Sequence, residues 1–246
     1  MSHPSRRSLL LGGGAAVLGG GFLAASASPA SASPAAASPA AVPPAAASPI
    51  AASDGEPFAR LLAGNQRFVG GHARHPHQSI ADLHEVATGQ HPFAITVGCA
   101  DSRVSPELLF DQGLGDIFDN RVAGNIVDDL LLGSIEFAVE EFGSPLIVVL
   151  GHERCGAITA TIDAIESGGT APGHIGVIVE ALRPIVEPVL SQPGDKVENA
   201  VRANVRAQTA QLLSRSELLA EHVAAGELRV AGARYDLDNG RVTLLR

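Results

Sequence analysis

Acidic residues are absent from the first 53 positions of this 246-residue chain, where the only Lys or Arg residues are Arg6 and Arg7. From Asp54 onward the chain has the mixed charge and regularly spaced apolar residues that are typical of a globular protein. Residues 54–246 are therefore the candidate folded domain. A domain of that size buries roughly 70% of its unfolded surface, which is enough for a hydrophobic core.

Clusters of basic residues are also absent from the sequence. The chain has 17 Lys and Arg residues against 26 acidic ones, which gives a formal net charge of −9. No basic stretch is rich in aromatic residues. These absences argue against nucleic acid or an anionic membrane as a partner, because both are recognised through concentrated positive charge.

A long uninterrupted apolar run is missing too. The run after Arg6-Arg7 reaches only about Ala25 and is broken by the glycines at 12–14 and 19–21, so it is short for a membrane anchor. A basic start, a modest apolar stretch and small residues at 25–27 predict an export signal over residues 1–27. The paired arginines are typical of a twin-arginine signal. We expect an exported protein, periplasmic or extracellular, with no stable membrane span after processing.

Residues 28–53 consist almost entirely of Ala, Ser and Pro. Such a segment has too few large apolar groups to offset the entropy lost on ordering, so it predicts a disordered linker. The expected organisation is thus a signal at 1–27, a linker at 28–53 and one domain at 54–246.

Within that domain, predicted strands alternate with predicted helices. The apolar runs Phe93–Val97 and Leu146–Leu150 are typical of buried strands covered on both faces, as in parallel sheets. The pattern predicts an α/β fold with a mainly parallel central sheet flanked by helices. Further strands are expected at 116–122, 228–235 and 242–245, the last two as a hairpin, and helices at 58–69, 80–88, from 105, at 130–142, 157–167 and 175–225, the last region broken around Pro184, Pro188 and Pro193.

Cysteine is scarce: the chain has two, Cys99 and Cys155, and each follows the end of a predicted buried strand within a few residues. Ligands of open parallel sheets bind beyond the carboxyl ends of the strands. If the two strands are neighbours, Cys99, His152 and Cys155 converge on one point.

Two interpretations of this group compete. Two thiolates and an imidazole form a good zinc set, and three protein ligands with an open fourth position are typical of a catalytic site, where zinc lowers the pKa of bound water to about 7. In an exported protein, however, two lone cysteines are by default a disulfide. The adjacent His152, Asp101 and Arg103 favour the metal, because a disulfide needs none of them.

Asp101 and Arg103 are the candidate catalytic residues. They are two positions apart, so they can pair, and an arginine beside an aspartate favours the ionised carboxylate. Such a carboxylate can orient a hydroxide toward an electrophile. A surface ion pair is the alternative, and it would contribute little.

The residues Cys99-Ala100-Asp101-Ser102-Arg103-Val104, with Gly151-His152-Glu153-Arg154-Cys155-Gly156-Ala157 later in the chain, resemble the signature pair of β-carbonic anhydrases. The similarity covers almost all of residues 56–246. It includes Gly64-Asn65-Gln66-Arg67-Phe68, Pro106-Glu107, Ala123-Gly124-Asn125 and Tyr235-Asp236-Leu237.

The resemblance implies one Zn²⁺ per subunit, held by Cys99, His152 and Cys155, with Asp101 and Arg103 beside it. Asp101 either pairs with Arg103 or moves onto zinc as a further ligand. The implied reaction is the reversible hydration of carbon dioxide to bicarbonate by zinc-bound hydroxide, in a homodimer or homotetramer. Possible proton relays are His72, His75, His77 and His84.

The chain departs from the family pattern at Ala100, where Ser is common, and at Val122, where Asn is common. It has no Trp, so a regulatory bicarbonate site built on tryptophan is absent or differently built. Two other functions remain open at this stage. One is a carbonyl sulfide or carbon disulfide hydrolase on the same scaffold, and the other is a non-catalytic domain with a Cys99–Cys155 disulfide.

Overall fold

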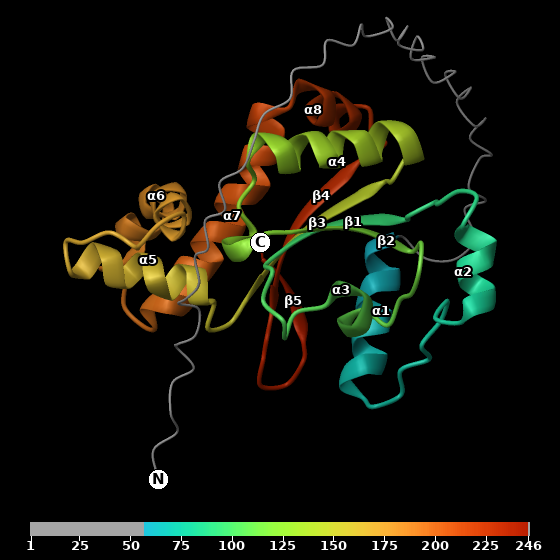
Figure 1. The fold of residues 1–246 in the computed structure, drawn as a ribbon, viewed down its shortest axis with the longest axis horizontal. Coiled ribbons are helices and arrows are strands. Elements are labelled where there is room, and N and C mark those ends of the chain that lie inside the picture. The colour runs from blue at the N-terminus through green and yellow to red at the C-terminus, as the bar shows by residue number, and fades with distance from the viewer. Residues whose placement is uncertain (1–56, 246) are drawn as a thin grey trace, which may run out of the picture. The chain divides into compact units, whose positions relative to one another are not determined.

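The computed structural model describes residues 57–245, which form a five-stranded sheet between layers of helices (Figure 1). The predicted export signal and linker lie outside the described residues. Among the helices of 57–245, none is both long and apolar enough to cross a membrane.

The sheet has the strand order β2-β1-β3-β4-β5. The first four strands in this order pair in parallel, and β5 pairs antiparallel with β4 as the second strand of the terminal hairpin. This confirms the predicted α/β fold with a mainly parallel sheet. The strands are β1 (Ala94–Gly98), β2 (Ile117–Arg121), β3 (Leu146–His152), β4 (Arg229–Tyr235) and β5 (Val242–Leu245).

The helices follow the predicted order. They are α1 (Pro57–Val69), α2 (Ile80–Val86), α3 (Pro106–Leu109), α4 (Asp129–Phe142), α5 (Gly156–Glu166), α6 (Ile175–Val186), α7 (Lys196–Arg215) and α8 (Glu217–Ala224), with 3₁₀ turns η1 (Ala123–Asn125) and η2 (Glu187–Val189).

Three predicted helix or strand boundaries were wrong by two residues or more, and the others agree to within one residue. Pro184 does not break the helical region but lies inside α6, which continues to Val186 because its apolar residues, Leu182 among them, are buried against neighbouring helices. Helix α2 ends two residues before the predicted Thr88. Strand β3 does not stop at Leu150, since it pairs with β4 as far as His152.

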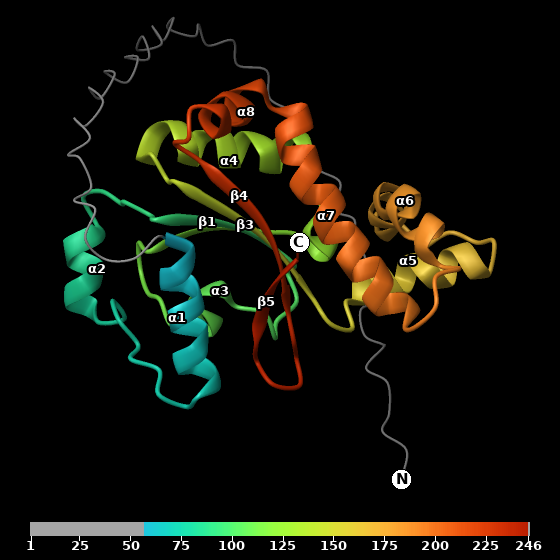
Figure 2. The same cartoon turned by 180° about the vertical axis from the view of Figure 1, so that it is seen from behind.

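Successive side chains of a strand point to opposite faces, so each strand of the sheet contributes to two cores. On one face Ile95, Val97, Ile147 and Val149 pack with residues of α4, α7 and α8. On the other face Ala94, Leu146, Val148 and Leu150 pack with residues of α1 and α3. Figure 2 shows α4 and α8 on one side of the sheet and α1 and α3 on the other.

A third apolar cluster lies beyond the carboxyl ends of β1 and β3. Here Ile158 of α5, Leu182 of α6 and Val201 of α7 surround Cys99 and Cys155. The cluster places both cysteines where the sheet ends and the α5–α6 pair begins.

Helix α1 is held against α3 at unusually close range. A Cβ added to Gly64 would lie 1.7 Å from the carbonyl oxygen of Phe110, so only glycine fits there. The next residue, Asn65, is buried and its Nδ2 donates to the carbonyls of Leu109 and Gly240 at 3.0 and 2.8 Å. These contacts bind α1 to both α3 and the terminal hairpin.

Candidate metal centre

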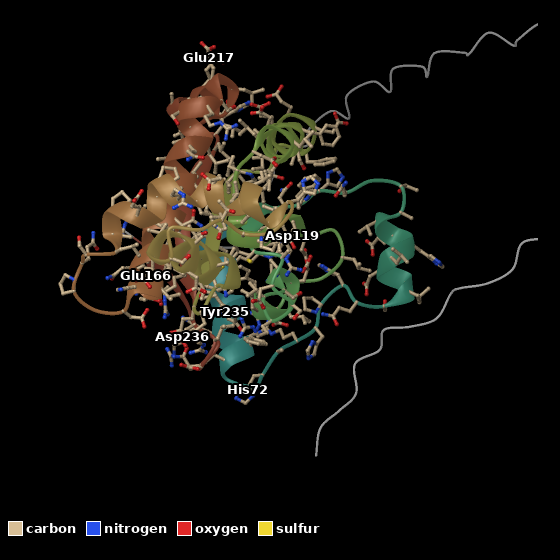
Figure 3. The ribbon with its side chains drawn as sticks, turned by 60° about the vertical axis from the view of Figure 1, so that its left-hand side comes forward. His72, Asp119, Glu166, Glu217, Tyr235 and Asp236 are labelled. Carbon is tan, nitrogen blue, oxygen red and sulfur yellow. The ribbon has the colours of Figure 1, made fainter. Side chains whose placement is uncertain are left out.

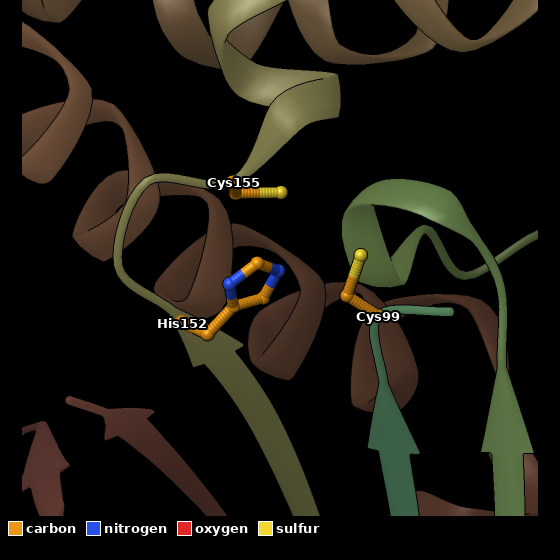
Figure 4. A group of neighbouring side chains, drawn as sticks. All are labelled: Cys99, His152 and Cys155. Atoms are coloured by element: carbon orange, nitrogen blue, oxygen red, sulfur yellow. The ribbon is translucent and has the colours of Figure 1, made fainter. Parts of the chain in front are cut away.

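Strands β1 and β3 are neighbours, and Gly98 at the end of β1 pairs with Leu150 of β3. Cys99 follows β1 directly, His152 is the last residue of β3, and Cys155 is the N-cap of α5. Their ligand atoms all lie within 4.8 Å of one another. Figure 4 shows both sulfur atoms and the imidazole ring directed into the same space. The two strands are therefore neighbours, which is the condition under which the sequence predicted that these three residues converge.

The imidazole of His152 has one nitrogen occupied and one free of hydrogen bonds. Nδ1 lies 2.8 Å from the carbonyl oxygen of Glu153, and because a carbonyl can only accept, Nδ1 carries the proton. Nε2 then presents its lone pair. It is fully buried and has no hydrogen-bond partner among residues 57–245. A buried lone pair between two thiols is what a metal ligand requires, so this donor set fits Zn²⁺.

The two thiols are free rather than joined as a disulfide, and both are buried. The pKa of Cys99 is lowered, first because the thiol of Cys155 donates to its sulfur, and further because the backbone N–H of Gly124 does so at 3.4 Å. The same hydrogen bond raises the pKa of Cys155, as do burial and the neighbouring thiolate. A divalent cation would favour the thiolate form of both sulfurs, because a metal binds a cysteine only after the thiol proton has left.

Asp101 forms a two-armed ion pair with Arg103. Its Oδ1 accepts from the backbone N and Nε of Arg103, both at 2.9 Å, and its Oδ2 accepts from Nη2 at 2.7 Å. These bonds hold the pKa of Asp101 well below its usual range, although burial opposes the shift. Oδ2 also lies 3.9 Å from Nε2 of His152. Of the two arrangements that the resemblance allows, the structure has Asp101 paired with Arg103 beside the cysteine–histidine group.

Two further supports of this loop were missed by the sequence analysis. Arg121 donates to the carbonyl of Cys99 at 3.0 Å and to that of Asp101 at 2.6 Å, which fixes the course of the chain between them. Gly124 aims its N–H at the sulfur of Cys99. Gly124 belongs to the Ala123-Gly124-Asn125 match of the sequence, but neither residue could be assigned a role from sequence, because the contacts depend on how β2 pairs with β1.

The loop between His152 and Cys155 makes an exposed ion pair through Arg154 and a partly buried one through Glu153, and the partly buried pair is the one that can hold the loop. Arg154 has a φ of +49°, a conformation that non-glycine residues seldom adopt, and its guanidinium makes two hydrogen bonds to Asp238. Glu153 pairs with Arg234, whose side chain is only 11% exposed. Arg234 also pairs with Asp236, which Figure 3 shows beside Tyr235 at the end of β4. The hairpin therefore helps to position the ligand loop.

The structure also places Val122 and the four histidines that were considered as proton relays. Val122 bonds through its backbone alone, donating to Gly98 and accepting from Ala100, and so extends the β1–β2 contact. The candidate proton relays His72, His75, His77 and His84 are exposed residues of α2 and of the loop before it. Of these, His77 is paired with Asp116 at 2.8 Å.

Known proteins resemble this chain over the same residues. The family model for carbonic anhydrase matches residues 94–242. Carbonic anhydrase 2 of Mycobacterium tuberculosis is 44% identical over 184 residues, which cover 75% of this chain and 89% of that protein. A carbonic anhydrase of Mycolicibacterium smegmatis is 43% identical over 184 residues, again 75% of this chain and 89% of the relative.

Solved structures agree with the sequence matches. Tetrameric β-carbonic anhydrases from Sordaria macrospora align with a TM-score of 0.61 and 27% identity, over 76% of this chain and 96% of theirs. The β-carbonic anhydrase CcaA aligns with a TM-score of 0.59 and 27% identity, over 77% of this chain and 88% of its own. With its mainly parallel sheet and its buried Cys–His–Cys group, the chain belongs to the carbonic anhydrase family, in its β class.

Proposed function

We infer that this protein is a zinc-dependent carbonic anhydrase that interconverts carbon dioxide and bicarbonate. The observation that carries this inference is the buried group of Cys99, His152 and Cys155, whose ligand atoms lie within 4.8 Å of one another and whose imidazole Nε2 has no other partner among the described residues. Relatives of the chain bear the name carbonic anhydrase.

Zinc would be held by the two sulfurs and by His152 Nε2, with a fourth position open. When bound, the ion lowers the pKa of water to about 7 and so supplies hydroxide as a nucleophile at neutral pH. On the protein side, Ile158, Leu182 and Val201 pack against the cysteines and keep bulk water away from them. Exclusion of water strengthens the electrostatic interactions within the site.

Asp101 is the proposed catalytic residue, and Arg103 holds it in place. Three hydrogen bonds from Arg103 keep the carboxylate ionised, so it accepts hydrogen bonds and does not donate them. A carboxylate in this state accepts a hydrogen bond from the attacking hydroxyl group and so directs a lone pair of the hydroxyl oxygen toward carbon dioxide. The same carboxylate is the candidate fourth ligand if Arg103 releases it.

We propose that the protein works as a homodimer or as a tetramer built from dimers. Helix α4 exposes large apolar side chains, Leu130 at 87% and Phe137 at 54%, and the outer edge of β2 has no partner strand among residues 57–245. Exposed apolar groups beside an open sheet edge are typical of contact surfaces. Sedimentation would test this assembly, since the mass of a single chain at working concentration would contradict it.

We propose further that the enzyme is exported by the twin-arginine route. The support is the sequence Arg6-Arg7 before an apolar run and the small residues that follow it. Replacing both arginines by lysine is expected to keep the protein inside the cell, and fractionation of cells that express either form measures this. Unchanged export of the Lys-Lys form would contradict the twin-arginine route.

The deciding experiment is stopped-flow hydration of carbon dioxide by protein isolated without chelator. We expect rapid hydration that rises from neutral to alkaline pH, because hydroxide becomes available around a pKa of about 7. Removing zinc with a chelator should abolish the activity, and adding zinc back should restore it. Zinc is measured in each sample, so loss of activity can be assigned to loss of metal.

Carbonyl sulfide and carbon disulfide are assayed in the same series, since the ligand set alone suits all three substrates. Hydrolysis of the sulfur compounds by zinc-loaded protein that does not hydrate carbon dioxide would contradict the proposed reaction. Protein isolated without zinc and with Cys99 and Cys155 oxidised would instead support the non-catalytic domain.

A further inference from the structure

The inner face of α7 carries two buried amide side chains. Asn204 and Gln208 are each 1% exposed, although they lie one helical turn apart among buried apolar residues such as Val201, Val205 and Leu212. Burying an amide is costly unless its hydrogen bonds are made inside the protein. Asn204 and Gln208 are therefore expected to make hydrogen bonds inside the protein that an apolar side chain could not make.

The hydrogen bonds of Asn204 and Gln208 form one continuous series. The backbone N–H of Val127 donates to Oε1 of Gln208 at 2.9 Å, and Nε2 of Gln208 donates to Oδ1 of Asn204 at 3.0 Å. Nδ2 of Asn204 then donates to the carbonyl of Gly124 at 2.8 Å and lies 3.3 Å from Oδ1 of Asn125. This series of hydrogen bonds begins at the backbone after η1, passes through the two side chains of α7, and returns to η1 at Gly124.

Gly124 stands between this series of hydrogen bonds and the metal centre. Its carbonyl is held by Asn204, while its N–H points to the sulfur of Cys99 at 3.4 Å. Its φ of +78° lies in the region that favours glycine, and an added Cβ would lie 3.0 Å from Leu182 Cδ1 and 3.2 Å from Ala157 Cβ. Both polar groups of Gly124 are thus engaged, the carbonyl with Asn204 and the N–H with Cys99, so the bond to Asn204 helps to hold the direction of the N–H.

We propose that Asn204 is a positioning residue of the metal centre, which holds the Gly124 carbonyl so that the Gly124 N–H keeps its hydrogen bond to the Cys99 sulfur. The inference rests on the proposed function and extends it, because the ligand it concerns is the one assigned to zinc. A hydrogen bond to a ligating sulfur orients the sulfur and withdraws electron density from it. Asn204 thereby acts on the metal without touching it.

The test variant is Asn204→Asp, which keeps the shape of the side chain and the acceptor for Gln208 but replaces the Nδ2 donor by oxygen. The matched control is Asn65→Asp in α1. Asn65 is 4% exposed and also donates from Nδ2 to the carbonyl of a glycine, at 2.8 Å, but its bonds lead to α3 and the hairpin. Both substitutions place a carboxylate against backbone carbonyls, so general destabilisation is common to the two.

Two measurements are made on full-length protein: zinc affinity by competition with a chelator, and the thiolate-to-metal charge-transfer band of the cobalt(II)-substituted form. Asn204→Asp should lower zinc affinity about 10–100-fold, the usual effect of losing an outer hydrogen bond to a ligand. Its cobalt band should move to longer wavelength, because a sulfur without its N–H donor gives up an electron more easily. Asn65→Asp should leave both readouts as in the native protein.

Equal zinc affinity and an unmoved cobalt band in Asn204→Asp would overturn the inference while leaving the proposed function intact. A native protein that binds no zinc would overturn both. If Asn204→Asp does not fold, Asn204→Ala is compared with Asn65→Ala by the same two readouts and the same criteria.

Discussion

Replacing Asp101 by asparagine is expected to slow carbon dioxide hydration by about 10²–10³-fold, the usual effect of losing one positioned hydrogen bond at the reacting oxygen, while zinc content stays at the native level. The three proposed ligands are untouched, so the metal is retained. Asparagine would direct its single oxygen toward the donors of Arg103 and present its NH₂ group to the attacking hydroxyl. An NH₂ group donates and cannot accept, so the hydroxyl proton loses its acceptor. Stopped-flow hydration with zinc analysis measures both effects.

Asp238→Asn is the matched control for this variant. Asp238 also accepts two hydrogen bonds from one arginine, at 3.0 and 2.7 Å from Arg154, but its side chain is 71% exposed on the hairpin loop. Losing that pair should leave hydration close to the native rate, since exposed ion pairs contribute little. A zinc-loaded Asp101→Asn protein whose rate lies within about tenfold of the native rate would remove Asp101 from the catalytic step.

The strands could be predicted because burial on both faces leaves a simple pattern. The continuous apolar run at Leu146–Leu150 predicted a covered strand, and all seven residues of β3 are buried. Polar, Gly-bearing loops after this run and after Phe93–Val97 predicted where the ligands lie. That β1 and β3 are neighbours does not follow from either run, because strand order is decided by contacts along the whole sheet.

The supporting residues could not be predicted, because their partners are far away in sequence. Asn204 reaches Gly124 across 80 positions, and Arg234 reaches Glu153 across 81. In isolation, an Asn or an Arg is an ordinary surface residue, and nothing in the local pattern of α7 or β4 marks it as buried. The same limit explains Pro184, whose place inside α6 depends on packing against other helices.

The hairpin residue Arg234 makes partly buried ion pairs whose removal should weaken the fold. Its side chain is 11% exposed, and its guanidinium faces three carboxylates, with Glu198 at 2.7 Å, Asp236 at 3.1 Å and Glu153 as the third. Methionine would keep the apolar stem and remove the charge. Asp236 would then lose its arginine partner, and Glu198 and Glu153 would keep only the more exposed Arg202 and Arg154. We expect Arg234→Met to lower the free energy of unfolding by about 3–5 kcal/mol, measured by urea denaturation of zinc-free protein.

Arg202→Met is the control, because Arg202 pairs with Glu198 as well, at 2.6 Å, but its side chain is 40% exposed. That variant should lose no more than about 1 kcal/mol of the free energy of unfolding.

The pH dependence of the loss in stability distinguishes the ion pairs of Arg234 from its other contacts. Burial tends to raise the pKa of Asp236, but Arg234 and backbone donors hold it below its ordinary 3.8, so this pairing stabilises the fold above about pH 4 and the contribution fades as the carboxyl is protonated.

The deficit of Arg234→Met relative to native protein should therefore be largest at neutral pH and should shrink as the pH falls below about 4. Zinc-free protein is needed for the acid series, because protonation of thiolates and imidazole releases the metal and would add its own pH dependence. A deficit that is the same at every pH would show that the loss of stability does not come from the ion pairs of Arg234. Equal losses in Arg234→Met and Arg202→Met would show that burial of the three-carboxylate cluster adds nothing to its stability.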